Sequence, residues 1–341
     1  MSTVDMRKTD PPVAPDADAV TVTEANRVEQ VTRLLREQGG VAVLVVVFLA
    51  ASIFSSGFFD TGNLESILVG NAYVSLLALG MTFVIISGGI DLSVGSVFAL
   101  GGVLAAYGVN HGGGIVAVLL AVGVSAAWGL VQGLLIAKAR LAPFIVTLAG
   151  MLGARGLLQA ITDQGSKTYT VPKDSWFINI GNGTWVPIIT VVVLFVLGAV
   201  VLLRTRYGQS LFAIGGNENA AVLMGLPVLR NKVLVYVLSA TLAGSAGALN
   251  ASRLQSGVTN IGVGYELTAI AAVIIGGTLL SGGAGSVSGT AAGVLLLAIM
   301  QNLIGVHLSK YGSSASDAVN GGFLAVVVIL QTLLTRAERI E

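Results

Sequence analysis

The 341-residue chain lacks cysteine, has only two histidines and is poor in charge, since Asp, Glu, Lys and Arg make up 10% of it. Without cysteine it cannot form a disulfide, an iron–sulfur cluster, a thiolate zinc site or a cysteine nucleophile. The remaining acidic residues and histidines form no cluster typical of a membrane enzyme. We therefore expect no catalytic residue, no metal and no cofactor.

Net charge and hydrophobicity narrow the class of protein further. The 18 basic and 17 acidic residues leave a formal charge of +1, so nothing in the composition favours a nucleic-acid partner. Hydrophobic residues make up 54% of the chain and the mean hydropathy is +0.87. Soluble domains carry about 25% charged residues, and this chain falls far below that. The composition predicts a protein whose solvent is the lipid bilayer.

Long apolar runs recur along the sequence, and a run of about 20 apolar residues is what a helix needs to cross a bilayer. We expect an all-α, polytopic transmembrane bundle in which several helices are broken by glycine. Ten spans are predicted, each boundary being good to about three residues: 39–56, 66–86, 92–109, 115–137, 143–162, 185–203, 231–250, 265–280, 286–307 and 317–335.

The distribution of lysine and arginine predicts the orientation. Most of them fall in segments that lie on the cytoplasmic side if the N-terminus is inside, which gives N-in and C-in termini. The polar tail 1–38 is expected to be disordered at first and amphipathic from about residue 24, although a solvated helical lead-in explains that second part equally well. The membrane domain then covers 39–336, with a cytoplasmic loop at 204–232, and 337–341 forms a short tail.

Glycine is abundant, with 45 residues, many of them inside the apolar runs. Small residues let helix backbones approach closely, and glycine interruptions also occur in the broken helices of transporters. Two stretches, 87–95 and 281–289, share a Ser-Gly-Gly start and a Ser-Val finish. They resemble a weak internal repeat, although convergent turn chemistry would produce the same likeness.

Leu280 to Gly283 resembles the signature motif of ATP-binding-cassette ATPases. Hydrolysis of ATP by that class also needs Gly-x-x-x-x-Gly-Lys-Ser/Thr, whose amides and lysine hold the phosphates, and the chain has no such run. We therefore interpret the motif as coincidental and expect a chain that is not an enzyme.

Polar residues within the apolar regions are the candidates for a solute path. Asp91 is costly to bury and so points to function, but it also suits the N-cap of the helix that follows. Arg155 lies near the outer end of its span, where it can reach the interface or a wet cavity. Interhelical hydrogen bonding remains the alternative for each of the path candidates, which are Asn71, Ser87, Asp91, Ser93, Glu266 and Asn302.

The loop 204–232 contains the clearest local signals outside the spans. Gly215 and Gly216 interrupt the chain, and Asn217 can cap a short helix over 218–224 that Gly225 and Pro227 end. The apolar residues of this helix are unusual for a free loop. They indicate either a docking partner or packing against the protein's own bundle.

Three segments resemble the permease subunits of ribose-type sugar ABC importers: Met81 to Ser96, Gly208 to Gly225 with its Gly-Gly-Asn-Glu core, and Gly264 to Gly289. The resemblance runs from about residue 40 to the C-terminus. It implies a ribose-like monosaccharide as solute and a place in the bacterial cytoplasmic membrane as one of two copies. It also implies an ATPase subunit with two cassettes and an extracytoplasmic sugar-binding protein. The loop around Glu218 resembles the helix that couples the permease to the ATPase, and the residues implicated are Gly216, Asn217, Glu218, Asn219, Ala221 and Gly225. A self-sufficient carrier for a small polar solute is the alternative.

Overall fold

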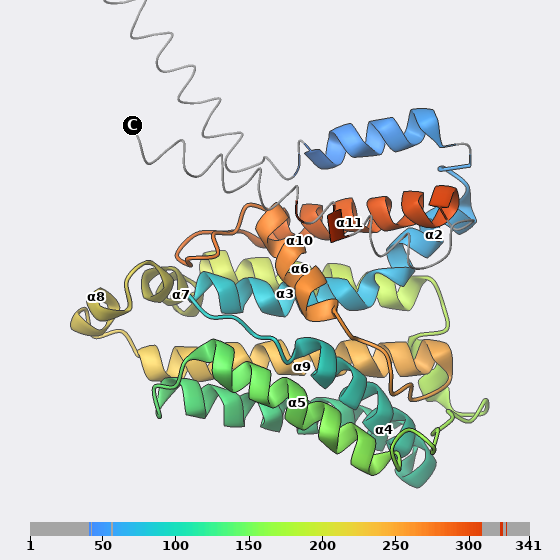
Figure 1. The fold of residues 1–341 in the computed structure, drawn as a ribbon, viewed down its shortest axis with the longest axis horizontal. Coiled ribbons are helices and arrows are strands. Elements are labelled where there is room, and N and C mark those ends of the chain that lie inside the picture. Colours follow the sequence, from blue (N-terminus) through green and yellow to red (C-terminus); the bar gives the residue numbers. More distant parts are fainter. Residues whose placement is uncertain (1–40, 42, 56, 309–320, 323–324, 326–341) are drawn as a thin grey trace, which may run out of the picture. The chain divides into compact units, whose positions relative to one another are not determined.

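The computed structural model describes residues 41, 43–55, 57–308, 321–322 and 325. Within these ranges the chain is built from helices and loops, and its strand pairing is confined to one isolated bridge between Thr170 and Ser256 (Figure 1). The predicted all-α class is confirmed. The tails 1–38 and 337–341 lie outside the described residues, as does the last predicted span except for residues 321, 322 and 325.

A short apolar helix over Val43–Phe54 precedes the labelled elements. These are α2 (Thr61–Gly70), α3 (Ala72–Ile86), α4 (Val94–Ala137), α5 (Pro143–Ile161), the 3₁₀ helix η1 (Trp176–Ile180), α6 (Trp185–Arg204), α7 (Arg206–Gly216), α8 (Glu218–Leu223), α9 (Val228–Leu254), α10 (Tyr265–Ile275) and α11 (Val287–Leu308).

Six helical stretches of the described chain are long and apolar enough to cross a bilayer: Thr61–Ile86, Val94–Ala137, Pro143–Ile161, Trp185–Arg204, Val228–Leu254 and Val287–Val306. The helix α6 shows that lipid is the solvent of this surface, since Val192, Val196 and Leu203 are each more than half exposed. Such an apolar surface is stable in hydrocarbon but not in water. The polytopic bundle is thereby confirmed, while the total of ten spans stays a prediction.

The predicted spans 92–109 and 115–137 are the two arms of α4. Gly113, with φ 78° and ψ −175°, breaks the helical backbone between them. The arms then fold against one another, because a side-chain carbon at Gly108 would lie only 2.7 Å from the Cα of Ala117. In Figure 1 the chain of α4 turns back accordingly.

The predicted span 265–280 is wrong in its length, because α10 stops at Ile275 after 11 residues. Gly276 caps it, and Gly277 follows with φ 88°, a conformation that L side chains rarely adopt. At 1.5 Å per residue, 11 residues cover about 16 Å, roughly half of the hydrocarbon core. A second interruption lies between α3 and α4, where residues 87–93 run back between α3 and α9 before α4 begins (Figure 1).

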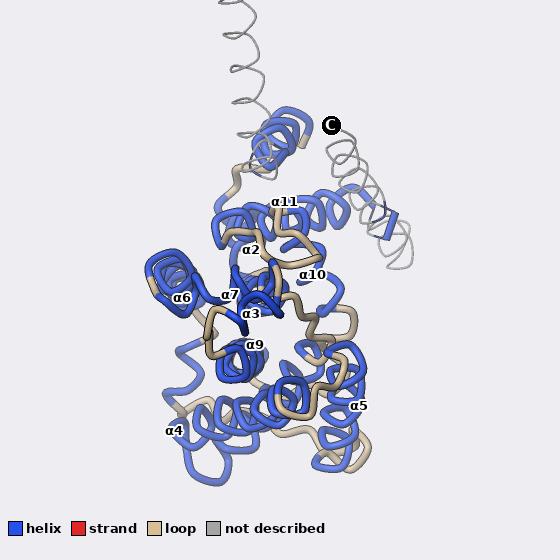
Figure 2. The backbone as a smooth tube through the Cα atoms, turned by 90° about the vertical axis from the view of Figure 1, so that its left-hand side faces the viewer, coloured by secondary structure: helices blue, strands red, loops and turns tan. Residues whose placement is uncertain are grey.

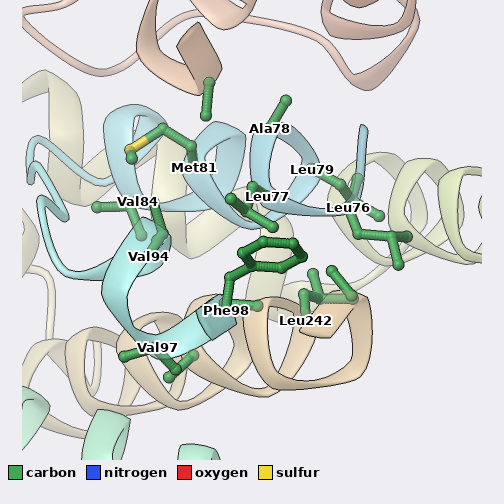
Figure 3. Packing of buried hydrophobic residues seen from close by; sticks show 14 of the residues in the cluster. Leu76, Leu77, Ala78, Leu79, Met81, Val84, Val94, Val97, Phe98 and Leu242 are labelled. Carbon is green, nitrogen blue, oxygen red and sulfur yellow. The ribbon is translucent and has the colours of Figure 1, made fainter. Parts of the chain in front are cut away.

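The helix α9 lies at the centre of the bundle, with α3 and both arms of α4 against it (Figure 2). Glycine permits this closeness: a side-chain carbon at Gly101 would be 2.7 Å from the Cα of Gly244. Large apolar side chains fill the space between these helices, and Leu76, Leu77, Phe98 and Leu242 meet there (Figure 3). The core therefore joins short stretches of α3, α4 and α9 into one packed unit.

Candidate functional site

The short helix α8 stands at the end of the bundle, joined to α7 and α9 (Figure 1). Its start is capped as predicted, because the side-chain oxygen of Asn217 accepts a hydrogen bond from the amide of Ala220 at 3.0 Å. This bond satisfies one of the amides that a helix leaves without a partner at its N-terminus. The break at Gly215 and Gly216 is also confirmed, since α7 ends at Gly216.

The end of α8 follows the Schellman pattern. The amide of Gly225 bonds the carbonyl of Val222 at 2.9 Å, and the amide of Leu226 bonds the carbonyl of Ala221 at 3.1 Å. Gly225 has φ 75°, which glycine adopts without strain. Pro227 follows and cannot continue the helix. Both ends of α8 are thus determined by local sequence.

The helix α8 has one face toward its own chain and one toward the surroundings. Ala221 is 0% exposed and packs with Ile214, Val228 and Leu226. Of the two explanations offered from sequence, packing against the protein's own bundle describes Ala221. By contrast, Val222, Leu223 and Met224 are 57%, 88% and 66% exposed.

The remaining residues of the coupling segment are exposed: Gly216, Asn217, Glu218, Asn219 and Gly225. Glu218 is also tied to the bundle, since its Oε2 accepts a hydrogen bond from the Lys232 ammonium at 2.6 Å. An exposed ion pair of this kind contributes about 0–1 kcal/mol to stability. It orients α8 on α9 more than it stabilises the fold.

Two of the six path candidates form a buried polar cluster between α3, α4 and α9. Asp91 is fully buried, and its Oδ1 accepts hydrogen bonds from the amide and hydroxyl of Ser93 at 2.9 Å and 2.6 Å. Its Oδ2 accepts one from the Ser239 hydroxyl at 2.9 Å. The Ser93 hydroxyl oxygen also lies 3.2 Å from Gln132 Oε1. A buried carboxylate persists only when donors satisfy it in this way.

The N-cap of α4 is Ser93, not Asp91, because the helix begins at Val94. Asp91 instead closes the turn before the helix and fastens it to α9. Gln132 and Ser239 were not predicted as members of this cluster. A lone amide or hydroxyl in an apolar run usually bonds within its own helix or to a neighbour, so sequence offers no signal that selects these two.

The other four path candidates do not join this cluster. The side chains of Asn71 and Ser87 donate to carbonyls of their own chain segment, those of Ile67 and Val84. Asn302 donates to Asn63 at 2.7 Å and so connects α11 with α2. Glu266 Oε1 accepts a hydrogen bond from the amide of Gly264 at 3.2 Å, at the start of α10. Interhelical bonding, the alternative named from sequence, describes Asn302, whereas Asn71 and Ser87 bond locally.

Arg155 has a defined partner that sequence did not identify. Its guanidinium donates to the carbonyls of Thr259 and Ile261 at 2.9 Å and 2.7 Å. These carbonyls belong to the loop between α9 and α10, so Arg155 holds that loop against α5. The arginine neither snorkels freely nor stands alone in a cavity.

These observations define a class of protein: a multi-pass membrane bundle with broken helices. A short capped helix at its end presents apolar side chains. The chain belongs to the family described as "Branched-chain amino acid transport system / permease component", which matches residues 63–333. It is a transmembrane permease by family.

Curated relatives cover nearly the whole chain. It is 39% identical to the ribose import permease protein of Bacillus subtilis (strain 168) over 310 residues, which are 89% of this chain and 94% of that protein. It is 35% identical to the fructose import permease protein of Bifidobacterium longum over 334 residues, 92% of this chain and 97% of the relative. The L-arabinose transport system permease protein of Escherichia coli is 35% identical over 317 residues, 90% and 94% of the two chains. No solved structure matches this chain.

Proposed function

We propose that this chain is the membrane subunit of an ATP-driven importer and carries a monosaccharide across the cytoplasmic membrane. The relatives named for ribose, fructose and arabinose support the solute class. The chain has no phosphate-binding loop, so its energy must come from a separate ATPase subunit. A sugar-binding protein outside the membrane would deliver the solute.

The observation that carries this proposal is the exposed apolar face of α8. Leu223 is 88% exposed although it lies on a helix whose two ends are capped and whose opposite face is buried. A rigid apolar projection in water is costly unless a partner covers it. An ATPase with a groove for one helical turn is the partner that a permease without its own energy source requires.

The mechanism follows from the way α8 is fastened. When the ATPase closes on ATP, its groove would move α8, and Lys232 and the Ala221 contacts would pass this movement to α9. Because α9 touches α3 and both arms of α4, the bundle would rock between outward-open and inward-open states. We propose that two copies of the chain enclose the solute path between them.

Loops at the opposite end of the bundle would receive the sugar-binding protein. The amide of Val171 bonds the carbonyl of Gln255 at 2.8 Å, and the amide of Gly257 bonds that of Tyr169 at 2.9 Å. Segments 163–184 and 251–264 are thereby joined into one surface. A connected surface can pass a docking event to α9 and α10, which continue directly from it.

Reconstitution tests the proposal. The chain, an ATPase subunit encoded beside it and the neighbouring binding protein would be placed in proteoliposomes, and uptake of labelled ribose, fructose, arabinose, xylose and galactose measured with and without ATP. We expect uptake of one or a few of these sugars that needs all three proteins and ATP. The chain alone should neither hydrolyse nor bind ATP.

Uptake by the chain alone, driven by a sugar or ion gradient, would instead identify a self-sufficient carrier and refute the proposal. Uptake of branched-chain amino acids, but of no sugar, would support an ATP-driven importer and would overturn the proposed solute class.

A further inference from the structure

Three chain segments far apart in the sequence meet at backbone level beside α8. They are the turn after α3, the end of α7 and the loop between α10 and α11. The amide of Gly283 donates a hydrogen bond to the carbonyl of Ile86 at 2.9 Å, which joins the first and the third segment. Gly215, at the end of α7, lies against both. We call this contact of Ile86–Gly88, Gly215–Gly216 and Gly282–Gly283 the glycine junction.

The closeness of the junction depends on the absence of side chains. A side-chain carbon at Gly215 would overlap the carbonyl oxygen of Ile86 and lie 2.6 Å from the amide nitrogen of Gly283. One at Gly282 would lie 2.9 Å from the Cα of Gly88 and 3.1 Å from that of Gly215. Real side-chain carbons essentially never come within 3 Å of backbone atoms, so only glycine permits this contact.

The junction connects the segment before α8 to the two places where the helical path is interrupted, between α3 and α4 and between α10 and α11. Gly215 lies two residues before the cap of α8, with Gly216 between them. From Ile86 the chain continues through the buried Asp91 turn to the start of α4, and from Gly283 it continues to the start of α11 at Val287. The two Ser-Gly-Gly stretches that resemble one another in sequence are therefore in contact with each other and with the segment that holds α8.

A second contact keeps the two broken-helix segments in register. The hydroxyls of Thr82 and Thr290 are hydrogen-bonded at 2.7 Å, in the interior between α3 and α11. The glycines of the junction have no side chains, so the three segments touch through backbone atoms. No change of rotamer can therefore absorb a displacement of one segment against another. A movement of α7 and α8 must therefore displace both turns.

We propose that the glycine junction transmits the movement of α8 to the starts of α4 and α11, and that Gly215 is its central positioning residue. This inference rests on the proposed function. It adds the route by which a movement driven by ATP hydrolysis is transmitted to the turns before α4 and α11. Replacing Gly215 with alanine would separate the three segments, so α8 would still bind the ATPase but would no longer move the two turns together.

The chain offers a matched control for this test. At Gly123, in the second arm of α4, a side-chain carbon would meet nothing within 4 Å, and the backbone is not in the left-handed region. Gly123→Ala therefore introduces the same methyl group outside the junction and outside the segment that carries α8. Gly282→Ala fills the junction from the third segment, where its added carbon would lie against Gly88 and Gly215 and its φ of 85° adds backbone strain.

The experiment compares wild type, Gly215→Ala, Gly282→Ala and Gly123→Ala in proteoliposomes with the ATPase and binding protein. ATP hydrolysis, sugar uptake and the amount of bound ATPase are measured on the same preparation. We expect Gly215→Ala and Gly282→Ala to keep the ATPase bound and hydrolysing within about twofold of wild type. Their uptake should fall at least about tenfold, so the ATP consumed for each sugar rises. Gly123→Ala should resemble wild type.

Three results would overturn the inference. Normal uptake by Gly215→Ala would show that the junction does not transmit movement. Parallel loss of uptake, hydrolysis and bound ATPase would show a structural contact only, as would failure of both junction variants to insert at normal abundance. If wild type itself shows no ATP-dependent uptake, the proposed function fails before the variants are compared.

Discussion

Residues 221 and 223 lie two positions apart in α8, yet their surroundings are opposite. Ala221 is buried against Ile214 and Val228, whereas Leu223 is the most exposed apolar side chain of the described residues. In a six-residue helix capped at both ends, the direction of each side chain is determined by the helix geometry. A substitution at Leu223 therefore tests the partner surface, while one at Ala221 tests the protein's own packing.

Leu223→Asp should reduce attachment of the ATPase at least about tenfold, equivalent to about 1.4 kcal/mol, because it places a charge in an apolar contact. The permease itself should insert at normal abundance, since the side chain contacts little of its own chain. Co-purification of the ATPase with the membrane subunit measures the effect. Leu223→Met is the control and should retain the ATPase, and normal attachment of the Asp variant would remove α8 from the interface.

Asp91→Asn should destabilise the protein by about 1–3 kcal/mol, because a buried donor loses its acceptor. Ser239→Ala should cost about 1 kcal/mol, and the double variant should cost less than the sum of the two, since both remove one interaction. Thermal unfolding in detergent measures all four proteins of this cycle. Additive losses would mean that Asp91 and Ser239 do not interact in the folded protein.

Among the elements, α4 shows how one residue divides a long apolar run. Gly113 adopts φ 78° and ψ −175°, a region that is essentially restricted to glycine. Open space surrounds it, so an added methyl group would cause no clash. Gly123 lies in the second arm of the same helix, also in open space but with an ordinary helical backbone.

This pair separates backbone strain from packing. Gly113→Ala should destabilise the protein by about 1–3 kcal/mol, since alanine must adopt a conformation it disfavours. Gly123→Ala should be neutral or stabilise by about 0.4–1 kcal/mol, because alanine restricts the unfolded chain. Thermal unfolding of both variants gives the comparison. Equal effects would show that the turn at Gly113 is not retained in the membrane.

At the scale of the whole molecule, orientation in the membrane follows from charge. Lys138 and Arg140 follow α4, Arg204 and Arg206 lie at the junction of α6 and α7, and basic segments are retained on the cytoplasmic side. The exposed face of α8 lies in the second of these regions, so we expect it to face the cytoplasm, where an ATPase can reach it.

Reporter fusions test this orientation. A reporter fused after Lys138 or Arg206 should be cytosolic, and one fused after Lys173 should be exported. Cytosolic activity at all three positions would contradict the alternation of spans. Export of the Arg206 fusion would place α8 on the wrong side of the membrane for an ATPase and would overturn the proposed coupling with it.

Sequence alone predicted the long apolar helices, most of their boundaries and both caps of α8, but not α2, η1 or α7 as separate helices. These features depend on hydropathy and on hydrogen bonds between residues at most five positions apart, which local residue types determine. The end of α10 at Gly276 was missed because Gly-Gly in an apolar run is compatible with close packing as well as with a break. Among the path candidates, sequence identified Asp91 and Ser93 but not their partners.

The tertiary structure alone decided which side of α8 is buried, that Asp91 bonds Ser239 across 148 positions, and that Gly215 meets Ile86 and Gly283. Contacts over such separations depend on how helices pack, and many helix arrangements satisfy the same apolar runs and caps. Contacts of glycine-rich stretches are especially hard to predict from sequence, because a residue without a side chain carries no hydrophobic or polar pattern that indicates its partner. The sequence thus determined a membrane helix bundle with a short helix capped at both ends, and packing of the backbone around α9 determined what that helix touches.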